Sequence, residues 1–347
     1  TSARNVAIGT QALNGAMNTN SNTYNVAVGY QAGTAVTTGV QNTLIGGNAG
    51  DALTSANKNV AIGYNAMGSE DTGDGSTAVG HSALAAMNYD GYAHNTAIGY
   101  HAGKEVTTGV RNTIMGGSAG DALTTGGHNV LLGYSAGGAL NTGGYNVAIG
   151  SLALDAEDGD GANVAIGYAA LTNLNAGASG HNVAVGYDSG KSMTTGIQNT
   201  LIGSLAGDAL TTGARNVAMG YLALSAEDTG NRNVAIGCDA LLVANNDANN
   251  YNTAVGDSAG EAVSTGVRNT IVGGLAGDQL TTGDNNIIIG YTAAASAVGV
   301  DNETVIGTTT TTSALVHGLK QPVTSANANV AAAAATPNTI YTFRDAD

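Results

Sequence analysis

One five-residue pattern constrains the fold of this chain more than any other feature. The pentad NVAIG stands at residues 5–9, 59–63, 146–150, 163–167 and 233–237, and near copies such as NTLIG and NTAIG fill the intervals between them. Successive copies begin 17 residues apart in most cases and 19 or 20 residues apart in the rest. Self-similarity at a short, nearly fixed period predicts a solenoid, in which each repeat forms one coil of the chain.

The pentad itself predicts a short β-strand that ends at a glycine. We number positions from the first residue of each pentad. Position 5 is Gly in all eighteen copies, from Gly9 to Gly307, and position 8 is Ala in sixteen of seventeen copies, Ser189 being the exception. Positions 2 and 4 are mostly Val, Thr, Ile, Leu or Met around a small residue at position 3, an alternation with the period of a strand. The Gly then turns the chain with a φ that other residues resist.

The length of the repeat excludes other repeat architectures. Seventeen residues at about 3.3 Å each trace a perimeter of roughly 55 Å, which suits a narrow coil with two or three short strands. A βαβ unit needs around thirty residues. Coils stacked at about 4.8 Å give a rod of roughly 85 Å. The predicted fold is therefore all-β, a parallel β-solenoid of about eighteen coils of 17–19 residues each.

Stacking explains why the pentad is repeated so closely. Each coil must offer the next one the same hydrogen-bonding edge, the same inward aliphatic side chains and the same turn. The Asn at position 1 is expected to stack into an amide ladder. The structural rung predicted from three identical pentads consists of Asn59, Ile62, Gly63, Asn146, Ile149, Gly150, Asn233, Ile236 and Gly237.

The repeat fades toward the C-terminus, and this predicts the domain organisation. Residues 1–300 form the repeat rod, and 301–318, which include five consecutive Thr, form a transition segment. Residues 319–347 hold both prolines and the only Phe, so they are expected to begin a further module. Because the chain starts at Thr1 without Met, we expect a processed protein or a piece of a longer one.

Composition and charge argue against several classes of function. Twenty-five acidic residues against ten basic ones give a formal charge of −15, which disfavours binding to nucleic acid and to anionic membrane surfaces. No apolar run approaches the roughly eighteen residues of a membrane span, so no membrane insertion is expected. The six His and the single Cys238 stand apart from one another in the sequence and form no catalytic or zinc-binding motif. We expect no enzymatic activity and no cofactor.

Acid-rich turns are the best candidates for a metal site. The stretches SEDTGDG and DAEDGDG cluster carboxylates with glycines, as calcium-binding loops do. The candidate ligands are Glu70, Asp71, Asp74, Asp155, Asp158 and Asp160. The third copy, AEDTGNR, lacks the last acid, and no bidentate Glu follows at the twelfth position. A solvated acidic turn is therefore the favoured interpretation, with calcium binding as the alternative.

Tyrosines recur at position 6, directly after the glycine that ends the pentad. Eight coils carry one, among them Tyr64, Tyr100, Tyr134 and Tyr168. Such a row covers an edge of the coil or a seam between chains, and this is the favoured interpretation. The alternative is a stacking platform for glycans on the surface, although Gly, Ser, His, Cys or Asp interrupts the row in other coils.

The rungs resemble two families of fibrous proteins. Glycine-punctuated NVAIG pentads followed by small residues resemble the head repeats of trimeric autotransporter adhesins. The longer forms NTAIGYHAG and NVAIGYNAM, and the segment DNETVIGTTTTTSALVHG, are similar to repeats and shaft ends of bacteriophage tail fibres. The resemblance covers roughly residues 1–318 and implies a side-by-side homotrimer. Small residues at positions 3 and 8 agree with it, because they would let neighbouring chains approach closely.

The sequence thus favours a structural and interaction protein. The first hypothesis is a rod of a bacteriophage tail fibre, extracellular on the virion surface, that reaches a glycan or protein receptor on a host cell. The alternative is a bacterial surface adhesin or another ligand-binding β-solenoid that binds ice or glycans. Ice binding would need a flat Thr row on every coil, and TTG triplets occur in only some coils.

Overall fold

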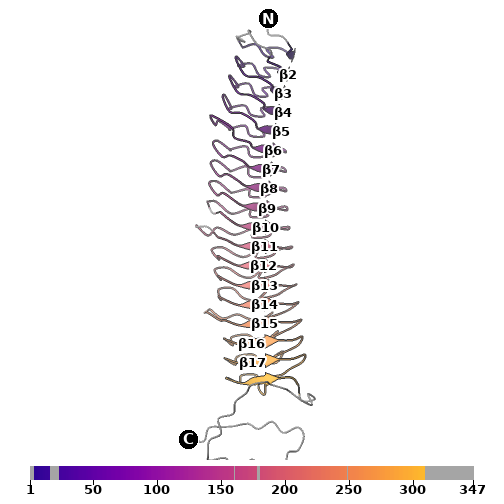
Figure 1. The fold of residues 1–347 in the computed structure, drawn as a ribbon, viewed down its shortest axis with the longest axis vertical. Helices are drawn as coiled ribbons and strands as arrows, with labels where there is room; N and C mark the ends of the chain where they lie inside the picture. The colour runs from indigo at the N-terminus through magenta and orange to yellow at the C-terminus, as the bar shows by residue number, and fades with distance from the viewer. Residues whose placement is uncertain (1–3, 16–22, 160, 178–179, 248, 309–347) are drawn as a thin grey trace, which may run out of the picture.

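The computed structural model describes residues 4–15, 23–159, 161–177, 180–247 and 249–308, and these form one continuous solenoid rod. Each coil contributes one three-residue strand to a single parallel sheet of 18 strands that runs along the rod (Figure 1). The described residues contain no helix, and hence none long and apolar enough to cross a membrane. The predicted all-β parallel solenoid is confirmed.

Every strand pairs with the strand of the preceding and following coil, in parallel and without a shift in register. The strands are β1 (Val6–Ile8), β2 (Val26–Val28), β3 (Thr43–Ile45), β4 (Val60–Ile62), β5 (Thr77–Val79), β6 (Thr96–Ile98), β7 (Thr113–Met115), β8 (Val130–Leu132), β9 (Val147–Ile149), β10 (Val164–Ile166), β11 (Val183–Val185), β12 (Thr200–Ile202), β13 (Val217–Met219), β14 (Val234–Ile236), β15 (Thr253–Val255), β16 (Thr270–Val272), β17 (Ile287–Ile289) and β18 (Thr304–Ile306). Seventeen steps of about 4.8 Å give a strand ladder roughly 82 Å long.

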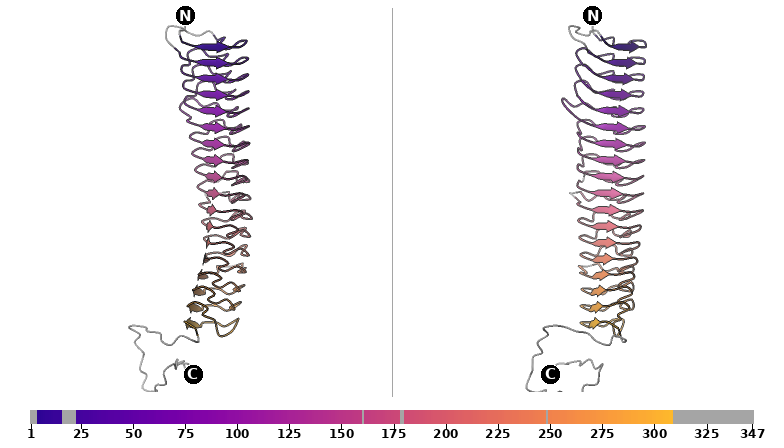
Figure 2. Two further views of the ribbon diagram at one scale, coloured as in Figure 1. Left: turned by 90° about the vertical axis from the view of Figure 1, so that its right-hand side faces the viewer. Right: turned by 45° about the vertical axis from the view of Figure 1, so that its right-hand side comes forward.

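The coil differs from the prediction in its strand content. We expected two or three strands per coil, but in the described part of the chain each coil has one, and turns make up the rest (Figure 2). These turns still stack, because backbone amides of one coil donate to carbonyls of its neighbours throughout, as Gly33 N does to Ala49 O at 3.0 Å. Hydrogen bonds between coils therefore continue well beyond the sheet.

The orientation of the pentad also differs from the prediction. The central residue of the strand points into the coil and is fully buried from β2 to β17, as are Ala27, Leu44 and Ala61. Positions 2 and 4 point outward, so Ile62, Ile149 and Ile236 are not inward rung residues as we expected. The prediction that positions 3 and 8 face a neighbouring chain is wrong for the same reason, because both are buried inside their own coil.

The buried asparagines follow from the same orientation. Odd positions of the pentad point inward, so Asn at position 1 is buried together with the residue at position 3. The predicted amide ladder is confirmed, and it gives most of these buried asparagines hydrogen-bond partners, although Nδ2 of Asn163 and of Asn233 has none within the described residues. Asn59 N donates to Asn42 Oδ1 at 2.9 Å, and Asn59 Nδ2 donates to Gly73 O at 2.7 Å within its own coil. Asn146 and Asn233 donate in the same way to the preceding Asn, each at 2.9 Å.

The glycine at position 5 is required both by its backbone conformation and by the space around it. Gly63, Gly150 and Gly237 have φ of 133°, 132° and 136°. A Cβ on Gly150 would lie 2.3 Å from the carbonyl oxygen of Gly167 in the next coil. Since L-residues rarely adopt such φ values and no neighbouring backbone can move away, the prediction that only glycine fits here is confirmed.

Core volume is balanced between positions 3 and 9. Where position 3 is Leu or Ile, position 9 is Gly, or Ala in β17's coil; where position 9 is Leu or Met, position 3 is Ala. Coils that are small at both positions are filled from their neighbours. A Cβ on Gly103 would lie 2.8 Å from Ile114 Cδ1 and 3.1 Å from Leu84 Cδ2. The core is thus one continuous column rather than a set of independent coils.

The ladder continues into the predicted transition segment, because β18 pairs with β17 and its Thr304 lies beside Ile287. Residues 309–318 of that segment and the predicted module at 319–347 lie outside the described residues.

Candidate functional site

In-register stacking turns every position of the repeat into a row of side chains along the rod. Val26 lies beside Thr43 and Ala27 beside Leu44, and the same relation holds for each pair of strands. A functional surface on this protein is therefore a row, or a group of neighbouring rows, rather than a single pocket.

The first such surface is formed by positions 2 and 4, which we call the outer strand face. It consists of the first and third residues of β1 to β18, nearly all Val, Thr, Ile, Leu or Met. Ile8 is 60% exposed, Met115 41% and Ile289 38%, and most of the others are half-buried. A stripe two side chains wide and about 80 Å long covers roughly 500 Å², which is at the upper end for an apolar patch on a monomeric soluble protein. The outer strand face is therefore a candidate interaction surface.

The second surface is the tyrosine row at position 6. Tyr64, Tyr100, Tyr134 and Tyr168 are all exposed, between 47% and 64%. At one of the positions where another residue interrupts the row, His81 packs its ring against the tyrosine rings of the two neighbouring coils. The His81 ring lies 5.2 Å from that of Tyr64 and 5.5 Å from that of Tyr100. The row is thus an exposed aromatic edge beside the outer strand face.

Glycines in this row leave room for the tyrosine of the next coil. A Cβ on Gly47 would lie 3.4 Å from the Tyr64 ring, and one on Gly117 would lie 3.7 Å from the Tyr134 ring. The tyrosine therefore leans over the glycine of the preceding coil, and the interruptions are part of the packing of the row.

The third surface is the residue directly before each pentad, position 0, which we call the basic row. Its cations are Arg4, Lys58, Arg111, Arg215, Arg232 and Arg268, and His94, His128 and His181 occupy further coils. Tyr24, Tyr145 and Tyr251 lie in the same row. These side chains extend from a left-handed backbone, with φ near 60° at Arg215 and Gln198 alike. All but Arg232 of these twelve residues are exposed.

Members of the basic row contact one another from coil to coil. The Arg4 guanidinium lies over the Tyr24 ring, 5.5 Å from its centroid, and Arg232 lies over Tyr251 at 5.4 Å. Arg215 Nε donates to Gln198 Oε1 at 2.9 Å. The row is therefore a pre-arranged ladder of cations and aromatic rings.

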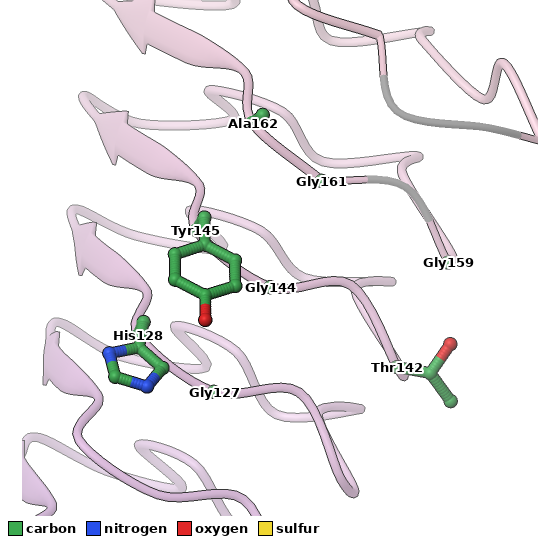
Figure 3. A pocket seen from close by; sticks show the side chains of 8 residues that line it. All are labelled: Gly127, His128, Thr142, Gly144, Tyr145, Gly159, Gly161 and Ala162. Atoms are coloured by element: carbon green, nitrogen blue, oxygen red, sulfur yellow. The ribbon is translucent and has the colours of Figure 1, made fainter.

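A shallow groove of about 470 Å³ runs beside the middle of the basic row (Figure 3). His128 and Tyr145 stack on successive coils along one side of it, with ring centroids 4.8 Å apart and planes at 6°. Thr142 lies on the other side, and Gly127, Gly144 and Gly161 line the space between. The groove is open here because position 16 is Gly in these coils, whereas other coils carry a side chain there, such as Val110, Ile197 or Asp284.

The acid-rich turns do not point their glutamates outward. Glu70, Glu157 and Glu227 occupy position 12, which is aliphatic or Met in the other described coils, and all three are fully buried. Glu70 accepts backbone amides of Gly73 at 2.6 Å and Thr72 at 3.2 Å. Burial raises the pKa of Glu70, and it raises the pKa of Glu227 to about 7. These carboxylates organise the turn from inside the coil.

The other candidate metal ligands lie apart from these glutamates. Asp74 Oδ1 accepts the amide of Asn57 at 2.5 Å, Asp158 is exposed, and burial raises the pKa of Asp155. Asp160 lies outside the described residues. Within the described ranges no group of three or more His, Cys, Asp or Glu side chains is arranged to hold a metal ion. Calcium binding stays a prediction, and Asp71 and its neighbours show no ligand geometry that supports it.

Sequence reasoning missed the basic row and the direction of the outer strand face. The signal for the basic row was available, since Arg, Lys or His precedes the pentad in half of the eighteen coils.

A comparison of the chain with protein-family models, with curated proteins and with solved structures finds no match.

Proposed function

We propose that the chain is the rod of a homotrimeric attachment fibre, most simply a bacteriophage tail fibre that lies outside the cell and reaches toward a host surface. The observation that carries this proposal is the outer strand face. A single solenoid needs only its inward residues to fold, yet aliphatic or Thr side chains recur at both outward positions in nearly every coil. Burying this stripe against further copies removes it from water.

The way the coils are joined supports a mechanical role. Each coil is tied to the next by the sheet, by backbone bonds between the turns and by the Asn ladder. Bending the rod would break several of these bonds at once, so the rod resists bending along its roughly 82 Å. Reach and stiffness are what a fibre requires of its shaft, and the proposal assigns the chain no catalytic role.

The number of copies and the biological setting come from the resemblance to adhesin heads and tail fibres. Three parallel copies can place their outer strand faces toward one common axis, which leaves the acidic turns in solvent. The charge of −15 keeps such a particle soluble outside the cell. The partner at the cell surface is a glycan or a protein receptor.

The structure gives no support to ice binding. The Thr–Thr pairs of the turns recur in only some coils, and one hydroxyl of each pair is already used, as Thr37 Oγ1 donates to Thr54 O at 3.2 Å.

Light scattering behind size exclusion tests the proposal. We expect a mass near three times 33.9 kDa, in rods that electron microscopy shows as three-lobed in cross-section. The same measurement in EDTA tests the acidic turns: we expect an unchanged mass. A monomer at micromolar concentration would contradict the proposed fibre.

A further inference from the structure

The cations of this acidic chain are concentrated in one row. The sequence has ten Lys and Arg residues, of which two, at positions 320 and 344, lie beyond the described residues. Of the remaining eight, two lie at position 10 and six lie in the basic row. Six of the eight described cations therefore lie along one edge of the rod, where a ligand laid parallel to the axis can meet several of them.

The cations of the row form no ion pair within the described residues, although Asp74 and Asp284 lie near it, accepting the backbone amides of the residues directly before Lys58 and Arg268. Lys104 and Lys191, the two at position 10, pair with Glu105 at 2.8 Å and with Asp188 at 3.0 Å. Among the described residues these are the only ion pairs, so no carboxylate lies within 4.0 Å of the row's cations. The six positive charges are available to an anion from outside.

The spacing of the cations fits a long polymer better than a small anion. Arg4, Lys58 and Arg111 are three coils apart, and Arg215 and Arg268 continue this interval further along the rod. Three coils correspond to about 14 Å, so a small anion meets one cation at these sites, or two where Arg215 and Arg232 lie on successive coils, whereas a chain laid along the rod meets several. Several weak contacts on one chain add to a useful affinity.

The rings between the cations suit a saccharide. Tyr145 is 69% exposed, and its neighbours in the row are the stacked His128 and the small Ala162. Gly144 and Gly161 keep the adjoining groove open (Figure 3). The apolar face of a sugar ring can therefore stack on Tyr145, while an acidic substituent on the same chain reaches Arg111 through a charge-assisted hydrogen bond.

We propose that the basic row is a binding track for a linear anionic polysaccharide, which lies parallel to the rod axis with its acidic groups on the arginines and its rings on the interleaved Tyr and His side chains. This inference rests on the proposed attachment function and specifies the chemistry of the receptor.

Two pairs of substitutions test the track with equal changes in charge. Arg215→Gln/Arg268→Gln removes two cations from the row, and Lys104→Gln/Lys191→Gln removes two from position 10. Gln is native to the row at Gln41 and Gln198, where φ is 62°, so the first pair is compatible with the fold. Fluorescence anisotropy with labelled alginate and dextran sulfate distinguishes carboxylate from sulfate ligands, and labelled neutral dextran is the control.

We expect the row pair to weaken binding of at least one anionic polymer about tenfold and the position 10 pair to change it less than about twofold. The slope of log affinity against log salt should become shallower by about two in the row pair. Neutral dextran should not bind. Equal losses in both pairs, or no loss in the row pair, would overturn the track.

Particle mass separates this inference from the proposed assembly. If the Arg215→Gln/Arg268→Gln variant both dissociates into smaller particles and loses binding, the basic row is a contact between copies and the proposed track is wrong. If the unaltered chain is a monomer and the row pair alone loses binding, the trimer is wrong and the track stands.

Discussion

In β12, Leu201 is fully buried inside the coil, whereas Thr200 and Ile202 on either side of it are half-buried and point out. The inward residue is matched to its surroundings: Gly190 in the preceding coil and Gly207 in its own both leave space for the Leu201 side chain. The outward residues are less restricted, because a single copy covers them only in part. The inward residue of the strand thus contributes to the core of the coil, whereas the outward residues remain available for contacts with other molecules.

The largest expected effect comes from placing charge on the outer strand face. Ile166→Asp/Ile202→Asp leaves the interior of each coil unchanged but puts two carboxylates per copy into the proposed seam, where desolvation is costly. We expect light scattering to show complete dissociation to single copies, with an unchanged circular dichroism spectrum. Ser204→Asp is the control, because Asp257 already occupies the same row. Retained assembly in the double variant would place the seam elsewhere.

Two adjacent glycines give a sharp test of the backbone. Gly116 has φ of 140°, and a Cβ there would lie 2.3 Å from Gly133 O; a Cβ on Gly117 would have only the Tyr134 ring nearby, at 3.7 Å. Gly116→Ala is expected to lower the free energy of unfolding by about 4 kcal/mol and Gly117→Ala by less than about 0.5 kcal/mol. Guanidinium denaturation of both variants measures the difference, and similar values for the two would refute the close stacking of position 5.

Truncations on the two faces of β12 compare the faces directly. Leu201→Ala removes a fully buried side chain, and we expect a loss of about 3 kcal/mol in the free energy of unfolding. Ile202→Ala should cost less than about 1 kcal/mol when measured on dissociated copies, since its side chain lies on the outside. If the dissociated copies lose more from Ile202→Ala than from Leu201→Ala, the assigned orientation of the strand is incorrect.

A pH-dependent effect is expected from the buried carboxylate of Glu227. Burial raises its pKa in the folded chain to about 7 from an ordinary 4.5, so the folded state binds more protons than the unfolded state between these values. The contribution of Glu227 to stability should therefore be fully present below about pH 4.5, be lost as the pH rises toward 7, and level off above, by up to about 3 kcal/mol. Glu227→Gln should flatten this part of the curve relative to the unaltered chain, as followed by denaturation at a series of pH values; an unchanged slope would contradict the shift.

Several features of the fold could be predicted because they depend only on one coil and the coil stacked directly on it. The period gave the solenoid, the invariant glycine gave the turn, and the Asn at position 1 gave the amide ladder. The direction of the strand could not be predicted, since both of its faces carry small or apolar residues. In the structure the odd positions face inward, where Asn59 donates its backbone amide to the preceding Asn and its side-chain amide to a carbonyl of its own coil.

Other features depend on side chains from several coils at once. The balance of volume at Gly103 involves Leu84 and Ile114 in the two neighbouring coils, which a single repeat does not show. The buried position of Glu70 could not be predicted from the acid-rich turn alone, since such a turn is usually exposed. It follows from position 12 of the repeat, which is buried in the other coils as well.

The central claim, that the outer strand face joins parallel copies, is tested most directly by distances between copies. A spin label at Ile202→Cys, in a Cys238→Ser background, should give one short distance between copies by pulsed electron resonance, because all three labels lie near the common axis. The same label at Asp208→Cys, in the acid-rich position 10 row, should give a longer distance. If the label at position 208 gives the shorter distance, or the label at position 202 gives none, the outer strand face is not the seam.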